Sequence, residues 1–205
     1  MDSRFLIKLI SLTIISIIAI YIFNSNYCLF RIASFSMEPT LVAGDIILVK
    51  KYKQSARINP GQIVLFQLPE YNTIDPDLYS KNLIKRCIYI PGEKTPDDIN
   101  VPIKNKVIKL SSNRYRQFKY LIDYEQSHSD KTINILNYTV HYTYQFRENY
   151  YFVVGDNLPK SFDSRQWGLL PESKIFGTTH VVLCSINNSL PFYKRFRKDR
   201  FLKRL

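Results

Sequence analysis

The stretch Gly44-Asp45-Ile46-Ile47-Leu48-Val49 is a short apolar run that begins directly after a glycine. Two similar runs follow, at residues 62–68 after Pro60-Gly61 and at residues 83–90 before Pro91-Gly92. Apolar runs of this length between glycine and proline residues are typical of buried strands. The composition agrees, because 15 Tyr and 13 Phe with only 6 Gly favour strands over helices. We therefore predict a mainly β fold built on an antiparallel sheet.

The region between residues 94 and 148 differs from the chain on either side of it. It is polar, charged and rich in Tyr, and from Tyr138 to Phe146 polar and aromatic residues alternate as in a half-exposed strand. Core-like strands return at residues 150–154 and 174–186. We expect one core that is interrupted by an inserted β-rich subdomain. The expected boundaries are a core at 24–93 and 149–190, an insertion at 94–148 and a basic tail at 191–205.

The N-terminal segment at residues 5–23 is apolar apart from Lys8 and scattered Ser or Thr. As a helix it spans roughly 28 Å, which is close to the thickness of a bilayer core. We predict an uncleaved, single-pass transmembrane anchor in the cell membrane. Arg4 and Lys8 favour residues 1–4 on the cytoplasmic side and the body on the extracytoplasmic side. A cleaved signal peptide begins similarly, but residues 24–27 offer no small-x-small cleavage site.

The net charge of +12 is uneven, because seven Lys or Arg lie between Lys194 and Arg204. Such a tail can be merely solvated, or it can lie on anionic lipid headgroups. No nucleic-acid-binding motif accompanies it, so we expect no nucleic acid partner. Cys28, Cys87 and Cys184 are an odd number without C-x-x-C spacing, which encodes neither a disulfide framework nor a zinc site. We expect no metal and no cofactor.

A candidate nucleophile follows the apolar segment, in Ser34-Phe35-Ser36-Met37-Glu38-Pro39-Thr40. In an extended segment Ser34 and Ser36 point to the same side, and Pro39 disfavours helix at Glu38. The serines would then lie on a rigid, non-helical edge. Serines beside a proline can equally be ordinary turn residues.

A serine hydroxyl needs a base, and the three histidines are poorly placed for that role. His128 falls in a polar loop and His141 on the polar face of a strand. His180 falls in an apolar strand, where we expect a buried core position. A serine-histidine triad is therefore not favoured.

Lys85 is the better candidate base. Its neighbours on the same strand face, Leu83, Cys87 and Tyr89, are largely apolar, whereas Arg86 points the other way. Burial in such a setting disfavours the ammonium and lowers the pKa of the amine. Alternatively, Lys85-Arg86 is a surface pair on an edge strand.

A fourth segment is Gly155-Asp156-Asn157-Leu158-Pro159-Lys160-Ser161-Phe162-Asp163-Ser164-Arg165-Gln166-Trp167-Gly168, followed by Pro171. Taken alone it is a turn-rich loop with an ion pair between Asp163 and Arg165. In this order, the segments of the chain closely resemble bacterial type I signal peptidases, or leader peptidases, which are serine-lysine dyad proteases. The resemblance covers the anchor, residues 34–40, residues 44–49, Lys85-Arg86 through Pro91-Gly92-Glu93, and residues 155–171.

The resemblance implies a membrane-anchored serine endopeptidase that removes signal peptides through a Ser36/Lys85 dyad. It implies that Ser34 and the backbone N–H of Ser36 form the oxyanion hole, and that Ser161 hydrogen-bonds to the lysine amine and orients it. It implies a mostly β fold with a variable subdomain inserted in the catalytic core. It also implies a group of polar contacts that fixes the fourth segment against the strand of Lys85, formed by Arg86, Asp156, Asp163 and Arg165. Leu158-Pro159-Lys160 departs from the polar run ending in Asn that relatives usually carry.

The implied partners are preproteins with signal peptides and membrane lipid, with the protein export machinery nearby. Two other functions agree with parts of the sequence. One is a dedicated maturation protease for a single pilus or conjugation substrate. The other is a catalytically silent, membrane-anchored interaction protein, against which the intact Ser36 and Lys85 motifs argue.

Overall fold

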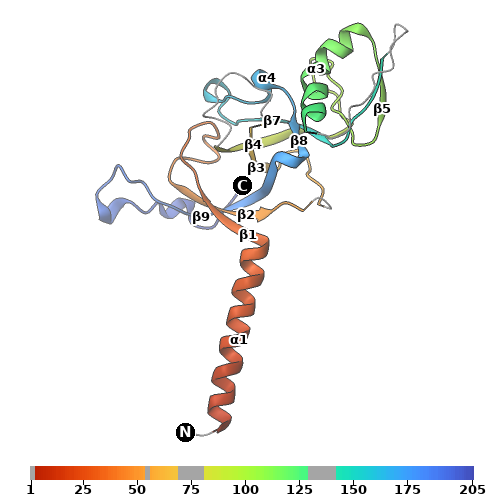
Figure 1. Cartoon of the computed structure of the whole chain (residues 1–205). Helices are drawn as coiled ribbons and strands as arrows, with labels where there is room; N and C mark the ends of the chain where they lie inside the picture. Colours follow the sequence, from red (N-terminus) through yellow and green to blue (C-terminus); the bar gives the residue numbers. More distant parts are fainter. Residues whose placement is uncertain (1–2, 54–55, 69–80, 129–141) are drawn as a thin grey trace.

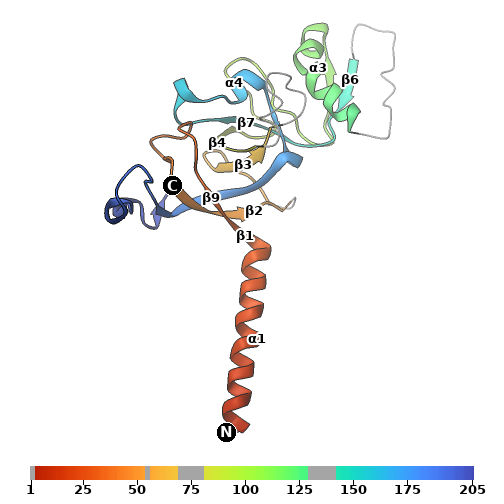
Figure 2. The same ribbon diagram turned by 60° about the vertical axis from the view of Figure 1, so that its left-hand side comes forward.

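The computed structural model describes residues 3–53, 56–68, 81–128 and 142–205. A long N-terminal helix projects from a β body, and a smaller lobe lies at the opposite end of that body (Figures 1 and 2). The helices and strands are α1 (Ser3–Asn26), β1 (Tyr27–Arg31), β2 (Asp45–Lys51), β3 (Ile63–Gln67), β4 (Asn82–Tyr89), β5 (Val107–Leu110), α3 (Ser112–Ser127), β6 (Tyr142–Gln145), β7 (Tyr150–Val154), α4 (Ser164–Trp167), β8 (Leu170–Pro171), β9 (Ile175–Ser185) and β10 (Lys203–Arg204). Short 3-10 turns are η1 (Leu158–Lys160), η2 (Glu172–Lys174), η3 (Phe192–Lys194) and η4 (Lys198–Arg200).

Eight strands form one sheet, in the order β1-β2-β9-β3-β4-β7-β8 with β10 paired to β9. Every pairing is antiparallel. The 11-residue strand β9 pairs with β2 on one side and with β3 on the other, so it joins the two parts of the core. The predicted mainly β, antiparallel fold is confirmed.

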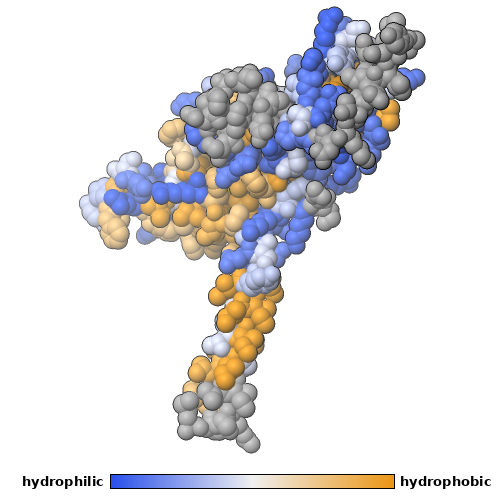
Figure 3. Space-filling view, viewed as in Figure 1, coloured by the Kyte–Doolittle hydropathy of each residue, from blue (hydrophilic) through white to orange (hydrophobic). Residues whose placement is uncertain are grey.

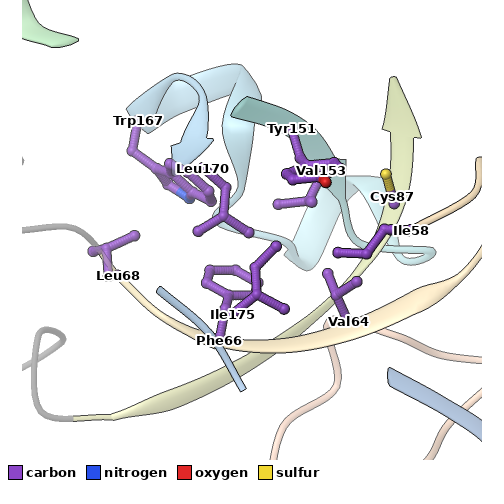
Figure 4. Close-up of a cluster of buried hydrophobic side chains, with 10 residues drawn as sticks. All are labelled: Ile58, Val64, Phe66, Leu68, Cys87, Tyr151, Val153, Trp167, Leu170 and Ile175. Carbon is purple, nitrogen blue, oxygen red and sulfur yellow. The ribbon is translucent and has the colours of Figure 1, made fainter. Parts of the chain in front are cut away.

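The apolar run of β3 is buried because both faces of the strand are covered. Val64 and Phe66 join one hydrophobic cluster, and the alternate residues Ile63 and Leu65 join another. Figure 4 shows the first cluster, in which Phe66, Leu170 and Ile175 lie together, with Trp167 on one side of the cluster and Cys87 on the other. The full membership of this cluster is Ile58, Val64, Phe66, Leu68, Cys87, Tyr151, Val153, Trp167, Leu170 and Ile175.

The three cysteines of the chain are free. Cys87 is buried in the cluster of Figure 4, whereas Cys28 and Cys184 are half-buried. Burial raises the pKa of the Cys87 thiol to about 12, with a smaller contribution from the charge of Glu93. Since the thiolate is the reactive form, this cysteine is an inert core residue.

Helix α1 leaves the body at β1 and extends away from it in both ribbon views (Figures 1 and 2). Residues Lys8–Asn26 are long and apolar enough to cross a membrane by length and composition, and none of that window is buried. The helix runs three residues beyond the predicted end at residue 23 and leads directly into β1. The prediction of one N-terminal apolar helix is confirmed.

The region at 94–148 contains a helix that the sequence pattern did not predict. Helix α3 begins after Ser111, whose side chain accepts a hydrogen bond from the Arg114 amide, and it packs beside the two-stranded sheet of β5 and β6. Its apolar face joins Tyr144 and Phe146 in a third hydrophobic cluster. These two residues belong to the predicted alternating stripe, whereas its part from 138 to 141 lies outside the described residues.

The C-terminal residues are not a merely solvated tail. Arg200 is buried, and its guanidinium Nε donates to Asp45 Oδ1 at 2.8 Å. Strand β10 then pairs with β9, and Leu205 packs against the cluster that contains Ile63. The last residues therefore belong to the folded body.

Candidate active site

Ser36 lies in the loop that connects β1 to β2. Two apolar residues of the loop, Met37 and Leu41, are fully buried and fix it to the body. Ser36 itself is 7% exposed, and its hydroxyl oxygen lies 3.4 Å from that of Ser34. The two serines therefore point to the same side, as the sequence pattern predicted.

Lys85 lies on β4 and reaches this loop. Its amine Nζ donates to Ser36 Oγ at 2.6 Å, and the residue is 3% exposed. Burial lowers the pKa of Lys85 from 10.5 to about 8, with the negative charge of Asp163 opposing the shift and the positive charge of Arg165 adding to it. The interpretation of Lys85 as an edge-strand surface residue is therefore wrong. A buried amine of lowered pKa in contact with a serine hydroxyl can accept a proton from it.

The loop after β7 holds the Ser36 loop through its backbone. The amide of Asn157 donates to the carbonyl oxygen of Ser36 at 3.0 Å, and its side-chain Nδ2 donates to the carbonyl oxygen of Phe35 at 3.0 Å. A Cβ atom at Gly155 would lie 2.4 Å from the Ser36 carbonyl oxygen and 2.2 Å from Ser161 Oγ, so only glycine fits this close approach. Sequence reasoning did not single out Asn157 or Gly155 for this role.

Asp163 organises the same loop from inside. It caps α4, and its fully buried carboxylate accepts hydrogen bonds from Ser161 Oγ at 2.6 Å, Arg165 Nε at 2.8 Å and the Gly155 amide at 3.0 Å. Burial alone would raise the pKa of Asp163, but these hydrogen bonds outweigh it and hold the pKa below its usual value. The carboxylate therefore stays charged beside Lys85.

The predicted contact between Ser161 and the lysine amine takes a different form in the structure. The hydroxyl of Ser161 donates to Asp163, and the charge of Asp163 acts on Lys85. Ser161 is buried at 5% exposure, so it lies inside the site but reaches the amine through the carboxylate.

Arg86 and Asp156 connect β4 to the loop after β7. The guanidinium Nε donates to Asp156 Oδ1 at 2.8 Å and its second nitrogen to Oδ2 at 2.6 Å, which is a two-point contact. Arg86 also donates to the carbonyl oxygen of Gly61 at 2.7 Å. Arg86 follows Lys85 on β4 and Asp156 precedes Asn157 in the loop, so the pair joins the two segments that bring Lys85 and Asn157 to the serine.

The two histidines that the structure describes lie on elements that do not form this site. His128 ends α3 and bonds to Tyr124, and His180 is exposed on β9, so its predicted core position is wrong. His141 lies outside the described residues. Within the ranges that the structure describes, no three His, Cys, Asp or Glu residues are grouped so that they could hold a metal ion.

Comparison with known proteins agrees with this arrangement. A family model described as "Signal peptidase, peptidase S26" matches residues 4–184. The chain is 27% identical to signal peptidase I of Buchnera aphidicola subsp. Acyrthosiphon pisum (strain APS), over 84% of this chain and 73% of that protein. It is 30% identical to signal peptidase I V of Bacillus subtilis (strain 168), over 78% of this chain and 88% of that protein. The chain therefore belongs to the signal peptidase family, peptidase S26.

Proposed function

We propose that Ser36 and Lys85 carry out the reaction of this serine endopeptidase, which removes signal peptides from preproteins. The observation that carries the proposal is the 2.6 Å contact between Lys85 Nζ and Ser36 Oγ inside a buried site. With the pKa of Lys85 at about 8, a useful fraction of the amine is neutral near neutral pH, on the order of a tenth at pH 7. A base of this pKa is well matched to proton transfer at physiological pH.

In the proposed reaction, neutral Lys85 takes the proton of Ser36 Oγ as the oxygen attacks the scissile carbonyl carbon. The carbonyl oxygen becomes an oxyanion, which accepts hydrogen bonds from Ser34 Oγ and the backbone N–H of Ser36. The C–N bond then breaks, the lysine proton passes to the leaving amine, and an acyl-enzyme ester remains on Ser36. Water loses a proton to Lys85 as its oxygen attacks the ester carbon. The bond between that carbon and Ser36 Oγ then breaks, the lysine proton passes to Ser36 Oγ, and the acyl product leaves as a carboxylic acid.

The surrounding polar residues are proposed to position the dyad. Asn157 holds the backbone of the Ser36 loop, which fixes the nucleophile against Lys85. Ser161 and Arg165 hold the carboxylate of Asp163, whose charge keeps the pKa of Lys85 from falling further. Arg86 and Asp156 join the strand of the base to the loop of Asn157.

We also propose that α1 anchors the enzyme in the cell membrane, with the N-terminus cytoplasmic and the body extracytoplasmic. The exposed apolar helix supports the anchor, and the early cation Lys8 supports the orientation. Few residues separate the end of α1 from Ser36, so the nucleophile stays close to the bilayer. A preprotein that is held in the same bilayer by its own apolar signal, beside the export machinery, would present its cleavage site at that level.

The test is cleavage of a preprotein by the full chain in detergent micelles. Ser36→Ala and Lys85→Ala should each lose about 10⁴-fold or more of the activity, because nucleophile and base act as a unit. The matched controls are Ser112→Ala and Lys109→Ala, at exposed positions on α3 and β5, which should cleave like the wild type. Cleavage by either dyad variant at the wild-type rate would refute the assignment. A panel of unrelated preproteins separates a general signal peptidase from a dedicated maturation protease.

A further inference from the structure

The inserted lobe, residues 94–128 and 142–149 of the described chain, carries none of the residues that the proposed reaction uses. Its surface is largely hydrophilic in the view of Figure 3, and its helix α3 lies beside α4 in both ribbon views (Figures 1 and 2). Phe118 and Leu121 of α3 share a hydrophobic cluster with Leu169, which lies two residues after α4. The lobe is therefore packed against the segment that supports the active site.

Tyr120 joins α3 to this segment. Its hydroxyl accepts a hydrogen bond from the amide of Leu169 at 3.1 Å. A Cβ atom at Gly168 would lie 2.6 Å from the same hydroxyl oxygen, and the φ angle of Gly168 is 92°, so the position needs glycine for both its size and its backbone. The side chain of Tyr120 therefore lies directly against the backbone at the end of α4.

Helix α4 connects this contact to Asp163, because the helix is a single turn of four residues. At its end the amide of Gly168 donates to the carbonyl oxygen of Ser164 at 3.0 Å. At its start Asp163 is the N-cap, and its side chain accepts from the amide of Arg165 at 3.3 Å. The hydroxyl of Ser164 also accepts from the amide of Val153 at 3.0 Å, which ties the turn to β7. A displacement of Gly168 would therefore move Asp163 as well.

The charges that act on Lys85 come from this same segment. Burial lowers the pKa of the amine most, Asp163 raises it, and Arg165 lowers it by a smaller amount. Arg86, the next residue on β4, is neutralised by its two-point contact with Asp156. A loosened α4 would therefore weaken chiefly the effect of Asp163 and let the pKa of the base fall further.

Asp163 also reaches the nucleophile. Its carboxylate accepts a hydrogen bond from the amide of Gly155 at 3.0 Å. Gly155 in turn approaches the backbone of Ser36 so closely that a Cβ atom there would lie 2.4 Å from the Ser36 carbonyl oxygen. The path that begins at Tyr120 therefore ends at both members of the dyad.

The lobe can hold Tyr120 firmly because α3 is also bonded near its C-terminal end. Glu125 is buried there, and its carboxylate accepts from the hydroxyls of Tyr144 at 2.7 Å and Tyr150 at 2.9 Å and from the amide of Arg147 at 3.1 Å. Tyr150 belongs to β7, so α3 is bonded to the core at two points along its length.

We propose that Tyr120 is a positioning residue for catalysis, through which the inserted lobe holds α4, and thereby Asp163 and Gly155, in place beside the dyad. The inference rests on the proposed reaction of Ser36 and Lys85. It gives the lobe a part in turnover that packing within the lobe does not require. A purely structural role of Tyr120 would lower stability and leave the chemistry of Lys85 unchanged.

The test compares two variants of the full chain in detergent micelles. Tyr120→Phe removes the hydroxyl that faces Leu169 and keeps the ring. The matched control Tyr144→Phe removes a buried hydroxyl from the same lobe but leaves α4 untouched, and Glu125 keeps its bonds from Tyr150 and the backbone. The measured quantities are kcat and KM for cleavage of a preprotein between about pH 6 and about pH 10.

We expect Tyr120→Phe to lower kcat about tenfold with little change in KM. The midpoint of the rising limb of kcat/KM should move about half a pH unit toward lower pH, because the charge of Asp163 acts less strongly on Lys85. Tyr144→Phe should match the wild type in kcat and in this midpoint. Burial raises the pKa of Tyr120 itself to about 12, so a midpoint in this range does not report its own titration.

Two further measurements separate positioning from a general loss of structure. Urea unfolding should give similar midpoints for the two variants, because each loses one hydroxyl contact. Hydrogen exchange followed by mass spectrometry should be faster over residues 161–170 in Tyr120→Phe, but not in Tyr144→Phe. Equal kcat values and equal pH midpoints in the two variants would overturn the inference and leave the proposed function intact. Full activity of Ser36→Ala or Lys85→Ala would instead overturn the proposed function.

Discussion

Replacing Lys85 by Met should abolish turnover and, at neutral pH, stabilise the fold. The pKa of Lys85 is lowered from 10.5 to about 8, chiefly by burial. A lysine whose pKa is lower in the folded chain destabilises it at every pH at which the unfolded chain holds the extra proton. Each tenfold difference in proton affinity corresponds to about 1.4 kcal/mol, so the buried amine costs roughly 3 kcal/mol at pH 7.

Loss of the hydrogen bond from Lys85 to Ser36 offsets part of the stability that the variant gains by removing the buried amine. Losing the bond costs about 1 kcal/mol, whereas the unbranched Met side chain fills the space of the lysine stem. The net stabilisation at pH 7 is therefore about 2 kcal/mol. Between about pH 8 and 10.5 the folded lysine is neutral while the unfolded one still holds its proton, so the wild type gains stability as pH rises, and the difference falls to about zero near pH 9.5.

The assay is urea unfolding of the full chain in micelles, followed by the fluorescence of its single Trp at pH 7 and pH 9.5. Trp167 suits this because it is buried beside Phe66, with ring centres 5.8 Å apart. The matched control, Lys109→Met on an exposed strand position, should stay within about 0.5 kcal/mol of the wild type at both pH values. A Lys85→Met chain that is less stable than the wild type at pH 7, or a difference that does not change with pH, would refute the reasoning.

Three further substitutions probe the site and its support. Ser34→Ala should lower kcat by roughly 10²–10³-fold with little change in KM, as expected for loss of an oxyanion donor. Gly155→Ala should lower preprotein cleavage by about 100-fold, because the added carbon displaces the serine loop, whereas Gly61→Ala, with open space around it, should cost stability but keep activity. Arg200→Ala should lower the free energy of unfolding by about 3–5 kcal/mol, because it leaves a buried carboxylate unpaired, and the exposed Arg204→Ala should change it little.

The strands of the core could be predicted from the sequence because their patterns are local. β2, β3 and β4 are short apolar runs with Gly or Pro at their ends. Run length and bounding residues of this kind indicate a buried strand more clearly than the propensities of single residues do. Helix α3 was missed because its sequence is polar and rich in Tyr, which favours strand by propensity alone. Its position depends on packing against Phe146 and on Glu125, a buried carboxylate that accepts hydrogen bonds from the hydroxyls of Tyr144 and Tyr150. Such contacts cannot be read from periodicity.

The dyad was predicted because its two residues stand in recognisable motifs, whereas the residues that hold it act through backbone contacts. Asn157 bonds to main-chain oxygens of the serine loop, and Gly155 matters for the space that it leaves. Neither role has a signature in residue type and spacing. The number of Lys and Arg residues at the C-terminus suggested an exposed basic tail. A count of charges cannot show that Arg197 and Arg200 face inward and bond to groups in a distant part of the chain.

The most direct test of a neutral Lys85 acting on Ser36 is the rate at which an active-site acylating probe modifies Ser36, measured by mass spectrometry across pH. The rate should rise about tenfold per pH unit below about pH 8 and level off above it, since only the neutral amine accepts the serine proton. Lys85→Met should be labelled very slowly at every pH. A rate that does not change between about pH 6 and pH 9, or labelling of Lys85→Met at the wild-type rate, would contradict the role assigned to this lysine.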